Sequence, residues 1–246
     1  MKYTALVMNA TIKNNFRWRI AAFIIFGIVF ICVAGVAVLF IALFIKPEAK
    51  AASPDLSILE NALGLILFMT SFCSVGIYSS VFAAQSLIRE KTRGNIQALL
   101  ATPVRPVDIC LGKTLGVFLP GLMFGIPMTL VMFLLINYAY LIPVTGFVAT
   151  PWMLVSSFIA VPLVFLSLTL LVHLIGMTGK AATGNVIAQV FLSVMPALMI
   201  NLAIRELSSS GSWLFTVILL GIAGIIGIFA LIIRPKLTTE RIILSH

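Results

Sequence analysis

Long uncharged apolar runs alternate with short charged segments along the chain. A helix rises 1.5 Å per residue, so about 20 residues are enough to cross the 30 Å hydrocarbon core of a bilayer. The uncharged stretch 114–179 is long enough for two crossings, and its Tyr, Gly, Pro and Trp residues between 137 and 152 predict an external turn that divides it. The pattern therefore predicts transmembrane helices at about residues 20–45, 61–88, 114–137, 152–177, 181–204 and 212–233.

Composition agrees with this pattern. Of the 246 residues, 61% are apolar and 9% are charged, whereas a soluble domain has about 25% charged residues. A soluble enzyme, a disordered chain and a nucleic-acid-binding module are therefore poor fits. The net charge of +9 does not indicate nucleic acid as a partner, because the basic residues are distributed between apolar runs and form no single basic face. We predict an all-α polytopic membrane protein that forms one domain, residues 1–246.

The basic residues also predict the orientation in the bilayer. If the N-terminus is cytoplasmic, thirteen of the sixteen Lys and Arg residues fall in cytoplasmic segments and three fall outside. Cytoplasmic loops carry an excess of Lys and Arg. We therefore expect both termini in the cytoplasm, with the segment 89–113 on the same side.

The first nineteen residues predict a helix that lies on the membrane surface. Apolar residues recur near helical spacing, while basic and amide residues fall largely elsewhere on the helix, as in an interfacial amphipathic helix. The apolar set is Tyr3, Leu6, Val7, Ala10 and Phe16, and the polar set is Lys2, Asn9, Lys13 and Arg17. A disordered basic segment is the alternative interpretation.

The cytoplasmic segment 89–113 contains a short predicted helix. Asn95 is a suitable N-cap for residues 96–102, and Pro103 ends that helix because it forces the preceding residue out of helical geometry. Ile96, Leu99 and Leu100 share one face. Such an apolar face outside the bilayer needs a covering surface, which the chain's own helices, lipid or a cytoplasmic partner would supply. A second helix is predicted to begin at Pro106, with Asp108 in its first turn.

The segment from Glu90 to Lys113 resembles the cytoplasmic segment of permease subunits of type-2 ABC transporters. Eight positions match that pattern in order and spacing: Glu90, Gly94, Leu99, Pro103, Val104, Ile109, Gly112 and Lys113. Six spans preceded by an amphipathic helix also fit this family, so the resemblance covers essentially the whole chain.

The resemblance implies an exporter driven by ATP that a separate ATPase subunit binds with Mg²⁺ and hydrolyses. It implies that the chain binds no cofactor itself, and that it works in a prokaryotic plasma membrane as a homodimer or with a paralogous permease. The residues implied to contact the ATPase are Glu90, Arg93, Gly94, Ile96, Leu99, Leu100 and Pro103. A solvated charged turn is the alternative interpretation of this segment.

The chain departs from the family pattern in three places. Asn95 and Gln97 replace the usual Thr and Glu, and Pro106 replaces a Ser or Arg, so the charges of the ATPase contact differ from those of the family. Residues 205–211 are too few for the paired external re-entrant helices of the family. No gating role of that element is carried over.

Polar residues inside the spans mark candidate pathway positions, because they are costly in the membrane. One stripe lies in the second span and one in the fifth: Ser71, Ser74, Tyr78 and Gln85, and Asn185, Gln189 and Ser193. In permeases of this type these two spans tend to line the route at the dimer seam. Hydrogen bonds between helices are the alternative explanation.

Other polar and small residues within the spans are expected to be structural. The pairs Gly112/Gly116 and Gly121/Gly125 predict close helix packing, and His173 is expected to be a hydrogen-bonded core residue.

The remaining motifs separate the competing functions. Gly112-Lys113-Thr114 resembles the end of a phosphate-binding loop, but position 107 is Val and no strand precedes it, so we expect no nucleotide on this chain. An ion-coupled secondary transporter or a channel-like protein is the alternative function, and the lack of a central acidic residue in any span counts against it. A membrane enzyme is third, because HExxH and GxSxG are absent.

Overall fold

The computed structural model describes residues 2–17, 19–50, 54–92, 104–179, 181–204, 210–238, 240 and 242. Within these residues the regular structure is helical, with no strand. Six helices in the described ranges are long and apolar enough to cross a membrane: Phe26–Ala49, Leu56–Ala83, Pro106–Leu141, Pro151–Thr178, Ala182–Asn201 and Trp213–Lys236. The prediction of an all-α, multi-pass membrane protein is confirmed at this level.

The helices follow the predicted spans, and several extend beyond them. The elements are α1 (Lys2–Arg17), α2 (Arg19–Phe40), the π-helical turn η1 (Ile41–Ile45), α3 (Lys46–Ala49), α4 (Leu56–Thr92), α6 (Pro106–Ile136), the π-helical turn η2 (Asn137–Leu141), α7 (Pro151–Val155), the π-helical turn η3 (Ser156–Ala160), α8 (Val161–Thr178), α9 (Ala181–Ile204), α10 (Trp213–Ile233) and the 3-10 turn η4 (Arg234–Lys236). Helix α9 has the predicted bounds. Helix α4 has 37 residues, about 55 Å, and therefore extends past a 30 Å hydrocarbon core.

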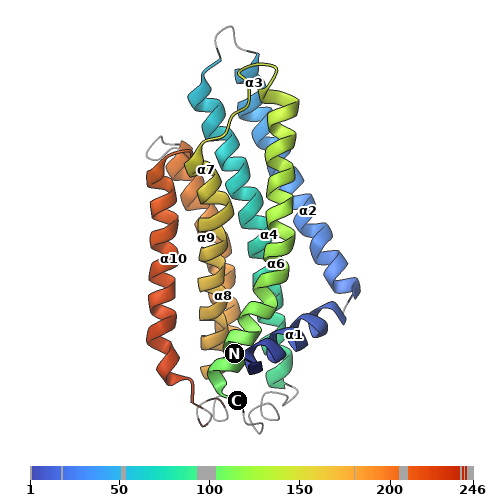
Figure 1. Ribbon diagram of the computed structural model, residues 1–246, viewed down its shortest axis with the longest axis vertical. Helices are drawn as coiled ribbons and strands as arrows, with labels where there is room; N and C mark the ends of the chain where they lie inside the picture. Colours follow the sequence, from blue (N-terminus) through green and yellow to red (C-terminus); the bar gives the residue numbers. More distant parts are fainter. Residues whose placement is uncertain are drawn as a thin grey trace.

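The long helices run side by side, and α1 lies obliquely across their lower end (Figure 1). The start of α1 and the end of α10 lie at this lower end, whereas α3 lies at the opposite end (Figure 1). Helices α2, α4 and α6 extend further upward than α9 and α10. The first and last described helices therefore reach the same end of the bundle, as an even number of crossings requires.

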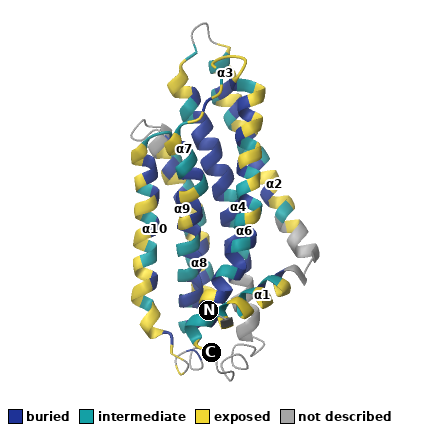
Figure 2. Ribbon diagram, in the orientation of Figure 1, coloured by how far each residue is buried: buried dark blue, intermediate teal, exposed yellow. Residues whose placement is uncertain are grey.

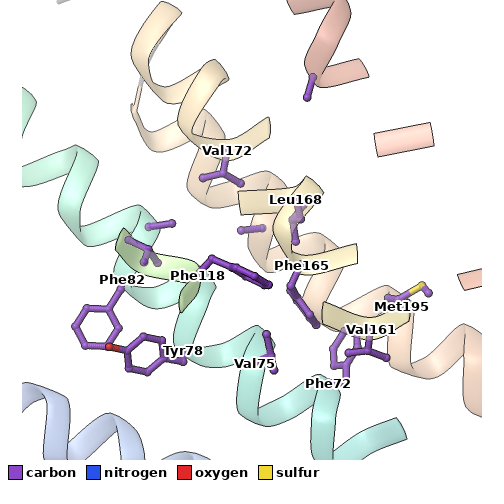
Figure 3. Packing of buried hydrophobic residues seen from close by; sticks show 14 of the residues in the cluster. Phe72, Val75, Tyr78, Phe82, Phe118, Val161, Phe165, Leu168, Val172 and Met195 are labelled. Atoms are coloured by element: carbon purple, nitrogen blue, oxygen red, sulfur yellow. The ribbon is translucent and has the colours of Figure 1, made fainter. Parts of the chain in front are cut away.

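Helix α4 occupies the centre of the bundle. Its residues 62–72 are all buried, and Figure 2 shows it as mostly buried between helices that expose one face. Phe72 of α4 contacts Phe165 of α8, with ring centroids 4.8 Å apart, and Phe191 of α9 at 6.4 Å. Figure 3 shows this aromatic packing continuing along α4 towards Tyr78 and Phe82.

Glycines let α4 and α6 approach each other closely. A methyl group at Gly125 would contact the Val75 side chain and lie 3.0 Å from Ser74 Oγ, and one at Gly121 would lie 3.0 Å from the Tyr78 ring. A Cβ contact of 3.0 Å is tighter than nine in ten real ones, so a side chain at either position would force a neighbour to move. The prediction that Gly121 and Gly125 serve close packing is therefore confirmed.

Helix α4 starts at a charged cap at the upper end of the bundle. The carboxylate of Asp55 accepts hydrogen bonds from Ser57 Oγ at 2.7 Å and from the Ser57 N–H at 2.8 Å. The hydroxyl bond, followed by the backbone bond, lowers the pKa of Asp55 below its ordinary value. Because a lowered pKa keeps the carboxylate charged, this cap is present at neutral pH and is lost only as the pH falls through the lowered value.

A second apolar cluster holds the upper end together, and Asn137 ties the loop 142–150 to it. Asn137 is fully buried, donates from Nδ2 to the Phe133 carbonyl at 3.1 Å and accepts at Oδ1 from the Val148 N–H at 2.8 Å. Gly146 in this loop has φ +94°, a conformation that favours glycine. The predicted turn between the third and fourth spans is therefore an ordered loop that packs back onto α6.

Replacing Asn137 by Leu is expected to destabilise the folded protein by about 1–3 kcal/mol, because the buried Val148 N–H loses its acceptor. Thermal unfolding in detergent measures this loss. Tyr138→Leu is the matched control, since Tyr138 is the next residue and is 67% exposed. Equal unfolding temperatures for the two variants would show that the Asn137 hydrogen bonds do not hold the loop.

Candidate functional site

The segment predicted to contact a partner connects α4 to α6 in the sequence. Helix α4 continues through Glu90 to Thr92, and α6 begins at Pro106 after an extended Arg105, with Asp108 in its first turn. This start of α6 confirms the predicted one. The predicted contact residues Arg93, Gly94, Ile96, Leu99, Leu100 and Pro103 lie outside the described residues, and so does the side chain of Glu90.

Helix α1 is fixed to α6 immediately beyond this segment. The Thr4 hydroxyl of α1 donates to the Asp108 carboxylate of α6 at 2.8 Å. A methyl group at Gly112 would lie 2.8 Å from the Thr4 carbonyl oxygen, and one at Gly116 would lie 2.9 Å from the Met8 carbonyl oxygen. Gly112 and Gly116 therefore let the backbone of α1 rest on α6, which confirms their predicted packing role.

The predicted helix near the N-terminus is present as α1, and apolar residues of its predicted membrane face are exposed. Tyr3 is 48% exposed and Leu6 is 61% exposed, whereas Thr11 is buried against α6. Three members of the predicted apolar face, Tyr3, Leu6 and Ala10, are thus exposed, and a fourth, Val7, contacts α6. The position of α1 at a membrane surface remains a prediction.

Replacing Gly116 by Leu is expected to release α1, because the added side chain would meet the α1 backbone at Met8. A cysteine pair introduced by Thr4→Cys and Asp108→Cys reports this contact, since the two native side chains are 2.8 Å apart. Disulfide formation should fall roughly tenfold or more in the Gly116→Leu background. Gly221→Leu is the control, because Gly221 has open space around it. Unchanged cross-linking in the Gly116 variant would contradict the packing role.

The polar stripe of α4 faces the interior of the bundle. Ser71 and Ser74 are buried, and their hydroxyls donate to the Ser157 carbonyl of η3 and to the Thr70 carbonyl, each at 2.6 Å. Tyr78 is buried, its ring stacks on Phe26 of α2 at 5.3 Å, and its hydroxyl has no hydrogen-bond partner among the described residues. Gln85 lies on the same helix, and its side chain is outside the described part. In a single chain this stripe joins helices.

The polar stripe of α9 lies on the outer face of the bundle. Gln189 and Ser193 are exposed, and Asn185 is half-buried. Their hydrogen bonds stay within α9: Gln189 donates to Asn185 Oδ1 at 3.4 Å, and Ser193 donates to the Gln189 carbonyl at 3.0 Å. These side chains have no contact that would cover them within the described chain.

The two stripes do not line a common space in one chain. The side of α9 that meets α4 and α8 is apolar: the Phe191 ring packs against Phe72 at 6.4 Å and against Phe165 at 6.2 Å, and Met195 is buried. Figure 3 shows Met195 near Phe72 and Phe165. This aromatic layer separates the α4 stripe from the α9 stripe. A route that uses both stripes needs a rearranged bundle or a second chain.

Sequence reasoning missed a buried basic pair at the lower end. Lys113 of α6 is 2% exposed, although it was expected in a cytoplasmic segment, and His173 of α8 is fully buried. His173 Nδ1 carries the proton, since its partner at 2.8 Å is the Thr169 carbonyl. His173 Nε2 has no hydrogen-bond partner in the described ranges, so the expectation of a fully hydrogen-bonded histidine is met at one nitrogen only.

No family model, no curated protein and no solved structure matches this chain. The case for a function therefore rests on the residues and on how the fold places them. Within the part of the chain that the structure describes, no three His, Cys, Asp or Glu side chains come together as a metal site would require.

Proposed function

We propose that the chain is the membrane-spanning permease subunit of an ATP-driven ABC exporter, and that a separate ATPase subunit supplies the energy. The observation that carries this proposal is the connection that residues 93–103 make in the sequence between two helices. They join the lower ends of α4 and α6, and α1 is fixed across α6 within two turns of that junction. A force applied to this segment would act on the central helix of the bundle and on the helix that packs most closely against it.

The distribution of charge supports a cytoplasmic position for this end of the bundle. Lys13 of α1, Arg105 before α6, and Arg234 and Lys236 after α10 are all exposed at the lower end. The acidic residues of an ATPase groove and the anionic surface of a cytoplasmic leaflet would both favour such a face. The plasma membrane of a prokaryote is the expected location.

The exposed stripe of α9 supports assembly with a second permease chain. Polar side chains that face hydrocarbon cost free energy, and the hydrogen bonds of Gln189 and Ser193 among the described residues stay within α9. A second copy, or a paralogue, that covers Gln189 and Ser193 would remove this cost and would enclose the polar side chains between two chains. Substrate contact at Asn185, Gln189 and Ser193 is part of the same proposal.

Co-expression with an ABC ATPase encoded beside this chain's gene tests the proposal. The expected result is that the two proteins purify together and hydrolyse ATP, and that vesicles containing both move solute when ATP is present. A chain with residues 94–102 replaced by a flexible Gly/Ser segment of equal length is the control, because it keeps the spans and removes the predicted contact. Equal recovery of the ATPase with both chains would contradict the proposal.

An ion-coupled carrier is the second candidate, and the buried pair Lys113 and His173 favours it. Buried ionisable groups in a membrane protein are typical of proton pathways. The same vesicles distinguish the two functions: an imposed pH gradient without nucleotide should drive a carrier, whereas the proposed permease should move no solute under that condition.

A further inference from the structure

A pocket of about 120 Å³ lies between α6, α8 and α10 near the lower end of the bundle. Cys110 of α6, Leu174 of α8 and Ala230 of α10 are among the side chains that form its wall, and each is at most 3% exposed. Eight of its nine lining residues carry apolar or thiol side chains. Water is poorly accommodated in a cavity with so few polar partners, so the pocket suits an apolar group.

The pocket opens towards the lipid-facing surface of the bundle. Leu111 and Leu231, which also line it, are 39% and 60% exposed. An apolar cavity of about 150 Å³ can hold a benzene molecule. By that standard this pocket can hold a short segment of a hydrocarbon chain that enters from the side.

Among the described residues that line the pocket, the charged side chain is that of Arg234. It follows the 21 uncharged residues of α10, a length that spans the hydrocarbon core, so its guanidinium is placed at headgroup depth. The chain then turns in η4, where the Leu237 N–H donates to the Arg234 carbonyl at 3.1 Å, and Leu237 is buried as a further wall of the pocket. Arg234 itself stays exposed at the rim.

No described acidic side chain forms an ion pair with Arg234. Asp108 is the acidic residue in the nearby first turn of α6, and one of its oxygens accepts from Thr4 of α1. The rim therefore offers a guanidinium, which binds phosphate oxygens through charge-assisted hydrogen bonds. A ligand that satisfies both parts of the site has an apolar chain and an anionic head.

We propose that this pocket binds an anionic phospholipid from the leaflet on the α1 side, with part of one acyl chain between α6, α8 and α10 and with its phosphate on Arg234. Basic pockets between helices on the cytoplasmic side of a membrane protein are suited to such lipids. The site is separate from both polar stripes, because none of their described residues lines the pocket. The proposal holds whether or not an ATPase drives the protein.

Native mass spectrometry of the full chain, purified in detergent and delipidated, tests the headgroup contact. The chain is titrated with dioleoyl phosphatidylglycerol and with dioleoyl phosphatidylcholine. We expect roughly tenfold tighter binding of phosphatidylglycerol, and Arg234→Gln should remove that preference. Lys236→Gln is the matched control, because it removes the same charge from the same turn at a residue outside the pocket wall, and it should retain the preference. An equal loss in both variants, or no loss in Arg234→Gln, overturns the proposal.

Two further measurements test the apolar part of the site. Ala230→Leu fills the pocket from a fully buried position and should weaken the binding of phosphatidylglycerol, whereas Gly224→Leu, on the same helix at an open position, should not. The second measurement uses the wild-type chain, so it does not depend on a variant that folds: inorganic phosphate is added in excess to the complex with phosphatidylglycerol. It should fail to displace phosphatidylglycerol, and displacement would show a free-anion site and overturn the lipid assignment.

Discussion

Leu99→Asp is expected to abolish ATP-driven transport while the chain still inserts into the membrane. The sequence places Leu99 with Ile96 and Leu100 on the apolar face of the helix predicted at 96–102. If that face lies in a groove of the ATPase, a carboxylate there is buried without a partner, which costs several kcal/mol. Transport in vesicles should fall by roughly a hundredfold, and the ATPase should separate from the permease or turn over ATP without transport.

Ala98→Asp is the matched control for this prediction. It adds the same charge to the same short helix, one residue away and outside the predicted apolar face. It should therefore retain most of the transport. Gly94→Pro, which stiffens the entry to the helix, should uncouple hydrolysis from transport in the way that Leu99→Asp does. Normal transport in both Gly94→Pro and Leu99→Asp would show that residues 93–103 do not transmit force.

Gly125→Leu is expected to disrupt the packing of α4 on α6 and to cost about 3 kcal/mol or more. A side chain at this position meets the Val75 side chain, and it also lies 3.3 Å from the Val75 backbone nitrogen, which cannot move without shifting α4. Because α4 is central to the bundle, the loss should appear as a lower yield of monodisperse protein and as a lower unfolding temperature. Fluorescence-detected size-exclusion chromatography after heating measures both.

Gly224→Leu gives the comparison for Gly125→Leu. It makes the same substitution within α10, at a glycine with no neighbouring atom within 4 Å, so the change in helix propensity is matched. We expect it to leave the unfolding temperature close to that of the wild-type protein. Similar losses in the two variants would mean that the tight α4–α6 contact contributes little to stability.

The membrane crossings could be predicted from the sequence because one physical quantity, the free-energy cost of placing a charged side chain in hydrocarbon, decides them. Charged side chains are excluded from the hydrocarbon core, so the uncharged run between Lys180 and Arg205 fixes the bounds of α9 closely. The same reasoning underestimates α4 and α6. Residues 89–92 and 106–113 include charged residues and were therefore placed outside the spans, yet they are helical. A helix continues past the membrane wherever its residues have high helix propensity.

The surroundings of individual side chains could not be predicted in this way. Helical periodicity gives Ser74 and Gln189 similar places on polar stripes, yet Ser74 is fully buried and Gln189 is exposed. Which stripe is covered depends on the neighbouring helices, and no spacing within one helix specifies them. Lys113 was likewise expected in a cytoplasmic segment, yet it is buried. Its burial depends on the long-range packing at the base of α6, which the sequence around it does not specify.

Reconstitution of the purified chain into vesicles, with and without the proposed ATPase partner, is the most direct test of where the driving force comes from. With the ATPase and Mg²⁺-ATP present, solute should accumulate against its gradient, and accumulation should stop in the Leu99→Asp variant. The chain alone should carry no solute uphill, whatever ion gradient is imposed. Uphill movement by the chain alone, without nucleotide, would contradict the account.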